Sequence, residues 1–334
     1  MTNSKSNFRI MMAVAACLII AVNQSCKKSS DDQAEVESTN SSSKNVAKTN
    51  SVMYLAANSN SAGFQSLVNQ SVDGDIIILR TGSHYVTTPI SLPIGKNGIT
   101  IRGESGAVIR KAPNSFAAAA IEIRGNRNII DLVELDGGNL PEAGIIIYGQ
   151  RNTISNSKIH NCGTSAAKGA GILIHNTGSP VCAFNVVRGC SVYYNYMVGI
   201  SQNGHSDGTI RDNRIYENGA EGLTIDLLSH NNLTENNTIN DNNTANRGVG
   251  GIGIDQANGN RIINNTIRDT RFKSGLTFQN NIGGCDGTIV TGNHFYNNAM
   301  YGILQRQTQY QNTNTTISPN TYGGNVLGTT FIQN

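Results

Sequence analysis

Apolar and polar residues alternate in short runs along most of the chain, the pattern of β-strands that turn one face to a core. Strands with a leading glycine, then apolar, variable and apolar residues, start at Gly144, Gly171, Gly199, Gly222, Gly251, Gly275 and Gly302. Their starts are 27, 28, 23, 29, 24 and 27 residues apart. This period leaves no room for a helix between strands, so the sequence predicts a solenoid of parallel strands with one coil per repeat.

A short helix is predicted ahead of the strands. Phe64, Leu67 and Val68 have the i, i+3, i+4 spacing of one helix face. A helix over the end of a solenoid shields strand edges that would otherwise pair with other chains. We therefore expect residues 51–74 to cap a β-helix domain of residues 51–334.

Each coil is predicted to contain a second strand with the pattern apolar-x-x-Asn-x-apolar, as in IRDNRI from Ile210. Alignment of these segments produces one column, made of Ser157, Cys190, Asn213, Asn237, Asn265, Asn293 and Asn320. Amide side chains stacked at a bend bond to one another along the axis and satisfy buried polar groups. We interpret this column as a structural asparagine ladder.

A second column contains the candidate chemistry. The residue after the second apolar position of each strand faces outward, because side chains alternate across a strand. We call this the outer column; it reads Arg80, Arg102, Arg124, Tyr148, His175, Asn203, Asp226, Asp255, Gln279 and Arg306. Strands in a sheet are about 4.8 Å apart, so these side chains are expected to form one polar line.

Composition narrows the possible partners. The chain has 334 residues, 36 Gly, no Trp and a net charge of +3. No block of Lys and Arg is interleaved with aromatic residues, so nucleic acid is not an expected partner. The lack of Trp argues against a pure carbohydrate-binding module, which commonly uses flat aromatic faces, and leaves that alternative open.

The amino terminus has the pattern of an export signal. Residues 1–26 contain two basic residues, a short apolar run and small polar residues before Cys26, and residues 27–50 are polar enough to form a disordered tether. SCKKSSDD, around Cys26, resembles the start of lipoproteins of the Bacteroidetes. That resemblance implies a lipid on Cys26 and an anchor in the outer membrane, on its periplasmic or cell-surface face.

Four further cysteines follow the export signal, and an exported protein meets an oxidising compartment. They are Cys162, Cys182, Cys190 and Cys285. Four thiols allow three pairings, and buried free thiols are an equal alternative.

The glycine-led strands, the ladder and the opening DIIILRTGSHYVTTPISLPIGKNGITIRGESGAVI resemble the right-handed parallel β-helix proteins of the pectate-lyase-like family. The resemblance covers residues 75–322. It implies an all-β fold, a single-stranded right-handed parallel β-helix, and in many members an activity on anionic polysaccharides. A monomer is expected.

The first interpretation of the outer column is a lyase or C5-epimerase acting on a uronic-acid polysaccharide. His175 would abstract the C5 proton, Tyr148 would protonate the leaving oxygen, and Arg124 and Arg102 would neutralise the substrate carboxylate. Further substrate contacts are predicted at Asn203, Gln279 and Arg306.

Asp226 and Asp255 are predicted at equivalent places on adjacent coils, where like charges repel. They would share a proton, bind Ca²⁺ or act as the two carboxylates of a glycoside hydrolase; solvated turn residues are the simpler alternative. No other cofactor is expected.

Comparison within the β-helix enzymes leaves several alternatives open. The stretch from Asp255 to Gln279 is similar to the part of alginate and chondroitin lyases that contains a catalytic Lys and Arg, which are absent from those two places. Lys168 and Lys273 are alternative bases. The order of the Asp strands and of NGHSDG differs from that of polygalacturonases. A glycan-binding or adhesive protein is the non-catalytic alternative.

Overall fold

The computed structural model describes residues 50–113, 115, 117–166, 169–178, 181–281, 283–306 and 310–333. All of them belong to one compact unit, Lys48–Asn334. The predicted export signal, Cys26, nearly all of the tether and Lys168 lie outside the described residues. Among the residues described, no helix is long and apolar enough to cross a membrane.

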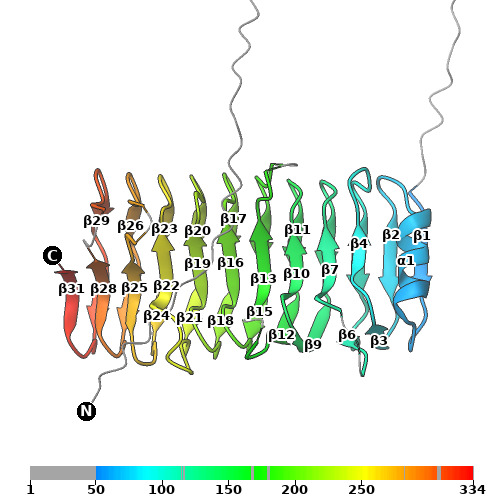
Figure 1. Cartoon of the computed structure of the whole chain (residues 1–334), viewed down its shortest axis with the longest axis horizontal. Coiled ribbons are helices and arrows are strands. Elements are labelled where there is room, and N and C mark those ends of the chain that lie inside the picture. The colour runs from blue at the N-terminus through cyan, green and yellow to red at the C-terminus, as the bar shows by residue number, and fades with distance from the viewer. Residues whose placement is uncertain are drawn as a thin grey trace, which may run out of the picture. The chain divides into compact units, whose positions relative to one another are not determined.

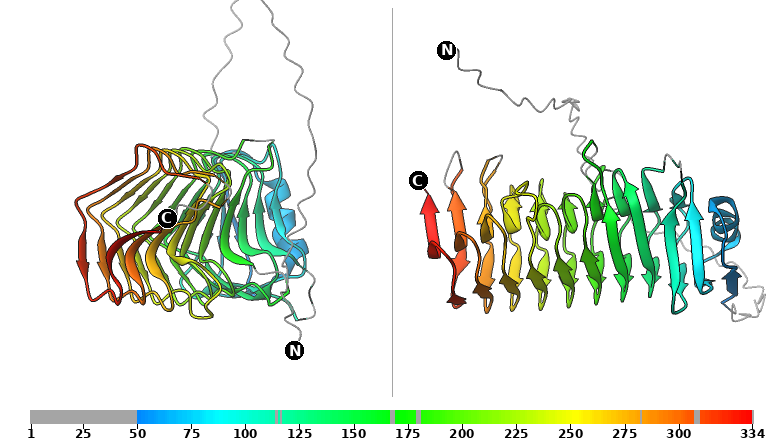
Figure 2. Two further views of the ribbon diagram at one scale, coloured as in Figure 1. Left: turned by 60° about the vertical axis from the view of Figure 1, so that its left-hand side comes forward. Right: turned by 90° about the horizontal axis from the view of Figure 1, so that it is seen from below.

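Three parallel sheets wrap the unit, and the chain visits them in the order A, B, C on every coil. Figure 1 shows the coils stacked along one axis, from α1 and β1 at one end to β31 at the other. About ten coils result, which confirms the predicted parallel β-solenoid. In Figure 2 the strands of successive coils lie over one another as continuous sheets.

Sheet A has eleven strands: β1 (Val52–Leu55), β2 (Ile76–Leu79), β5 (Thr100–Gly103), β8 (Ile129–Asp131), β11 (Thr153–Ser155), β14 (Val186–Arg188), β17 (Thr209–Arg211), β20 (Leu233–Glu235), β23 (Arg261–Ile263), β26 (Ile289–Thr291) and β29 (Thr316–Ile317). Sheet B has ten: β3 (Gly82–Val86), β6 (Ala107–Lys111), β9 (Glu134–Leu140), β12 (Lys158–Cys162), β15 (Ser191–Tyr193), β18 (Arg214–Tyr216), β21 (Thr238–Asn240), β24 (Thr266–Arg268), β27 (His294–Tyr296) and β30 (Thr321–Gly323). Sheet C also has ten: β4 (Ile90–Leu92), β7 (Ala119–Ile123), β10 (Ala143–Ile147), β13 (Ala170–His175), β16 (Ile200–Asn203), β19 (Leu223–Asp226), β22 (Gly250–Asp255), β25 (Ser274–Phe278), β28 (Tyr301–Arg306) and β31 (Gly328–Gln333).

The glycine-led segments form sheet C, as their alternation predicts. The predicted second strand is wrong in one respect, because it is two short strands in sheets A and B. In IRDNRI, Ile210 belongs to β17 and Ile215 to β18, and Asp212 between them has a φ of 57°. A left-handed residue turns the chain sharply, so one continuous strand cannot form there.

The predicted asparagine ladder is confirmed at the bend between sheets A and B. The N–H of Asn213 donates to Oδ1 of Asn237 at 3.0 Å, and the N–H of Asn237 donates to Oδ1 of Asn265 at 2.9 Å. Two further ladders occupy the other bends. One contains Asn128, Asn152, Asn185, Asn232 and Asn260, and the other contains Asn195, Asn218, Asn242, Asn298 and Asn325. Buried amides therefore bond coil to coil at all three corners.

The predicted capping helix is α1 (Ser61–Gln70). Its N-cap is Asn60, whose Oδ1 accepts the N–H of Gly63 at 3.0 Å. Phe64 and Val68 are buried, and Leu67 packs against the core. The helix covers the first coils at one end of the stack (Figure 1).

The interior of the coils is one apolar cluster, rich in isoleucine and continuous from Leu55 to Ile303. The four described cysteines, Cys162, Cys182, Cys190 and Cys285, are buried free thiols. Of the two alternatives for these residues, the structure has free thiols.

Candidate functional site on the outer face of sheet C

The register of sheet C confirms most of the outer column. Tyr148 stands beside Arg124 and His175, because Ile147 pairs with Ile123 and Ile174. His175 pairs with Asn203, Asn203 with Asp226, and Asp226 with Asp255. The same register places Gln279 and Arg306 on the next two coils.

The placement of Arg80 and Arg102 in this column is wrong. Arg102 lies in β5 of sheet A, where its Nε is 3.1 Å from Oδ2 of Asp131. Arg80 follows β2 of sheet A and pairs with Glu104 at 2.6 Å. The early coils are longer than the 22-residue spacing of these arginines, so that spacing leads from one sheet to another. Arg102 is therefore separated from Tyr148 and His175.

Three side chains predicted to act together do meet on sheet C. The Arg124 guanidinium carbon is 4.0 Å from the centroid of the Tyr148 ring. The rings of Tyr148 and His175 have centroids 6.1 Å apart and meet edge to face. The row runs across three successive coils and is open on its outer side, since all three side chains are only partly buried.

The electrostatic environment sets the protonation of this row. Burial lowers the pKa of His175, against an opposing effect of the Glu142 carboxylate. Burial also raises the pKa of Tyr148, and the charge of Glu122 raises it further, while Arg124 opposes both. At neutral pH the pair is therefore a neutral imidazole beside a protonated phenol. Nδ1 of His175 is buried and has no hydrogen-bond partner among the described residues.

Further along the same face, a pocket of about 390 Å³ contains the two predicted aspartates. Asn203, Ser201 and Thr224 line one side of it and Gln279 the other. A third carboxylate, which the sequence analysis did not predict, belongs to the same pocket: Glu221.

Glu221 is 6% exposed, and its Oε1 accepts the N–H of Val249 at 2.6 Å. A Cβ built on Gly248 would lie 2.5 Å from Cδ of Glu221, so the glycine makes room for the carboxylate. Equivalent places on other coils hold Val198 and Gly250. A carboxylate in a column of small or apolar residues was the signal that the sequence offered for this residue.

The carboxylates shift one another's protonation. Burial raises the pKa of Asp226 well above its usual range, and the charges of Glu221 and Asp255 raise it further. Burial also raises the pKa of Glu221. Oδ1 of Asp226 is buried and lacks a hydrogen-bond partner within the described chain. Asp226 is thus a protonated acid above the pH at which an exposed aspartate ionises.

The predicted Ca²⁺ site at Asp226 and Asp255 stays a prediction. In the described part of the chain, no group of three or more His, Cys, Asp or Glu side chains is placed to hold a metal ion. Among the alternative bases, Lys273 precedes β25 on sheet C. Its side chain is partly buried.

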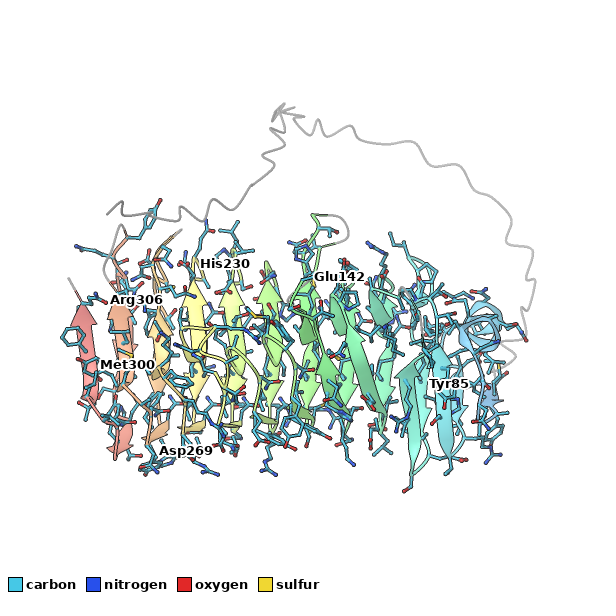
Figure 3. The ribbon with its side chains drawn as sticks, turned by 60° about the horizontal axis from the view of Figure 1, so that its bottom comes forward. Tyr85, Glu142, His230, Asp269, Met300 and Arg306 are labelled. Atoms are coloured by element: carbon cyan, nitrogen blue, oxygen red, sulfur yellow. The ribbon has the colours of Figure 1, made fainter. Side chains whose placement is uncertain are left out.

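A second pocket, of about 510 Å³, adjoins the first at the bend from sheet C to sheet A. His175 and His230 line it, and Asn203 and Leu227 are shared with the carboxylate pocket. In Figure 3, His230 and Arg306 lie toward the same edge of the stack, and Asp269 lies at the opposite edge.

The histidine of NGHSDG has a structural place. Gly208 occupies a ladder position on its coil, and the His205 ring fills the space: its Nε2 accepts the N–H of Asn185 at 3.2 Å. A Cβ on Gly208 would lie 1.7 Å from Cε1 of His205. Burial lowers the pKa of His205 to about 3, so it stays neutral.

Residues 143–322 match the family described as right handed beta helix region. No curated protein matches the chain. Among solved structures, alginate lyase from Paenibacillus sp. str. FPU-7 has a TM-score of 0.64 at 14% identity, over 85% of this chain and 99% of that one. Pectate lyase Pel9A has a TM-score of 0.62 at 20% identity, over 82% and 78% of the two chains.

The enzymatically active domain of tailspike protein 2 from bacteriophage CBA120 has a TM-score of 0.58 at 16% identity. That match covers 80% of this chain and 43% of the tailspike chain. Identities this low show a shared fold. The family match, in contrast, spans more than half of the 334 residues, and the chain therefore belongs to the right-handed β-helix family.

Proposed function

We propose that the protein is a lyase or C5-epimerase of a uronic-acid polysaccharide, with its active site on the outer face of sheet C. One observation carries the proposal: Arg124, Tyr148 and His175 stand side by side as a cation, a protonated phenol and a neutral imidazole. A base and an acid with unlike protonation are what proton abstraction next to a carboxylate requires. The structural likeness to a pectate lyase and an alginate lyase supports the same class of reaction.

In the proposed reaction the imidazole of His175 takes the C5 proton of a uronate unit. Arg124 offsets the negative charge that develops on the uronate carboxylate. In elimination, a double bond forms between C4 and C5, the C4–O4 bond breaks, and O4 takes the proton of the Tyr148 hydroxyl. In epimerisation C4–O4 stays intact, and C5 receives a proton on its opposite face.

The test is incubation with a panel of uronic-acid polymers, read as ultraviolet absorbance of the unsaturated product and, in D₂O, as deuterium at C5. We expect His175→Ala and Tyr148→Phe each to lower kcat by about 10²-fold or more. His294→Ala, on sheet B, is the matched control. Neither absorbance nor deuterium across the panel would refute the proposal, and binding without reaction would favour a glycan-binding protein.

A specific observation favours glycoside hydrolysis as a second candidate. Glu221 and Asp226 line one pocket with Asp255, and the pKa values of Glu221 and Asp226 are raised. A protonated carboxyl beside a second carboxylate is the acid and base pair of a glycosidase. New reducing ends without unsaturated product, lost in Asp226→Asn but kept in His175→Ala, would establish this reaction in place of the first.

We further propose that the protein is exported and anchored in the outer membrane through a lipid on Cys26. The sequence around Cys26 supports this. Metabolic labelling with a fatty acid should mark the protein and should fail to mark Cys26→Ala; equal labelling of both would contradict the proposal.

A further inference from the structure

Two exposed leucines interrupt the polar face next to Asp226. Leu227 and Leu228 have φ values of 53° and 67°, in the left-handed region that leucine avoids, and are 39% and 55% exposed. Each such residue costs roughly 1 kcal/mol or more, and strain of this kind concentrates at functional sites. The register places Gly204 and Gln256 at the equivalents of Leu227 on the neighbouring coils.

The leucine pair also lengthens its coil. Six residue steps separate Asp226 from the ladder residue Asn232, against five between Asp255 and Asn260 on the next coil. The extra residue is held firmly, because the N–H of Leu228 donates to the Gln256 carbonyl at 2.8 Å. Oγ of the following Ser229 donates to the Asp226 carbonyl at 2.7 Å. Two apolar side chains are therefore fixed toward solvent where neither core packing nor the ladder requires them.

Both leucines line the 510 Å³ pocket beside His175. Its other described lining includes the amides of Asn176 and Asn203 and the hydroxyl of Ser206, and no Lys, Arg, Asp or Glu. Uncharged donors facing an apolar wall suit a neutral group with one polar atom and one methyl, and no cation is present to hold a carboxylate.

We propose that this pocket receives an acetyl group of the polysaccharide, with its methyl against Leu227 and Leu228 and its carbonyl oxygen toward Asn176 or Asn203. The inference rests on the proposed function, since His175 and Asn203 belong both to the pocket and to the outer column. Leu227 lines both pockets, so an acetylated sugar seated there places its neighbour in the polymer over the catalytic row.

The test uses two pairs of probes: O-acetylated alginate oligosaccharides with the same oligosaccharides after mild alkali, and chondroitin oligosaccharides with their N-deacetylated form. Saturation transfer from the protein to the acetyl methyl protons measures binding, and kcat/KM for product release measures reaction. We expect strong transfer to the methyl and, for the better pair, a preference of about tenfold for the acetylated form.

The double variant Leu227→Asn/Leu228→Asn should lose methyl transfer and bring the kcat/KM ratio close to one, because asparagine tolerates left-handed backbone and removes the apolar wall. Phe272→Asn is the matched control: Phe272 is 55% exposed with a φ of 67°, as Leu228 is. Thermal unfolding verifies that both variants fold.

The outcomes separate this inference from the proposed reaction. Methyl transfer that depends on the leucines, without product, leaves the acetyl pocket standing and refutes the reaction. Product without acetyl preference or leucine-dependent transfer refutes the pocket alone, and no binding of either pair also refutes the pocket. Which pair shows the effect tells an O-acetyl ester from an N-acetyl amide.

Discussion

At the scale of single residues, a few side chains depart from the repeat, and each departure has an identifiable partner. His205 replaces a ladder amide where Gly208 leaves space, and Glu221 projects from a column of small residues toward Gly248. The sequence shows both departures only after the coils are aligned, because the glycine that admits Glu221 comes from the next coil.

The buried His205 makes stability depend on pH. Its pKa is about 3 in the folded chain, against about 6.5 for an exposed histidine. The unfolded chain takes up a proton below pH ~6.5 that the folded chain refuses, so the free energy of unfolding should fall between pH ~6.5 and 3 by up to about 1.4 kcal/mol per pH unit. Restoring a regular ladder with His205→Ala/Gly208→Asn should remove this component.

Chemical unfolding at several pH values measures the difference. The contrast with Gly208→Asn alone is informative, because an asparagine there meets the His205 ring and should destabilise the fold at every pH. Parallel pH curves for the wild type and the double variant would contradict the assignment.

Glu221 is predicted to hold the proton on Asp226. Its charge raises the pKa of Asp226, so Glu221→Gln should lower that pKa and shift ionisation of Asp226 to more acidic pH. Carbon NMR of Asp-labelled protein measures the titration without relying on activity. Glu235→Gln, in β20 of sheet A, is a control expected to leave the Asp226 titration in place, and an unchanged curve in Glu221→Gln would refute the coupling.

At the scale of elements, the sequence predicted sheet C and the ladder at the A–B bend because both repeat in the chain with little variation. It did not predict that the ladder motif spans two strands, since the bend depends on left-handed residues such as Asp212. Arg102 was misplaced for a related reason. Spacing between residues identifies a sheet only when coils have equal length, and the early coils are longer than the 22 residues assumed.

The ladders are predicted to contribute strongly to stability. Asn237→Ala removes the acceptor of the Asn213 N–H and the donor to the Ile210 carbonyl, at 3.0 and 2.9 Å. Buried groups left without partners cost about 1–3 kcal/mol each, so we expect a loss of roughly 2–5 kcal/mol in the free energy of unfolding. Denaturant titration measures it.

The neighbouring Asn236 supplies the control. It is exposed with a φ of 53°, which glycine adopts without strain, so Asn236→Gly should change stability little. Equal losses in the two variants would show that the ladder adds nothing beyond the bend itself.

At the scale of the whole molecule, one end of the coil stack is covered by α1. Phe64 is 1% exposed beneath that helix, and Phe64→Asp should detach the cap and expose sheet edges. We expect the wild type to sediment as a monomer and the variant to associate as its concentration rises. The exposed Tyr54→Asp serves as a control at the same end, and a monomeric Phe64→Asp would show that the helix does not protect the stack.

The extra residue at Leu228 shows how such a protein can diverge. The coil that contains it lengthens by one residue, yet Thr234 still pairs with Ile210 and Ile262, and the ladder passes through Asn232 unbroken. Insertions at the corners are therefore absorbed within a single coil. Selection can remodel the surface that meets a glycan one corner at a time, and two descendants of one ancestral solenoid can differ in the polymer they accept while their interiors remain superimposable.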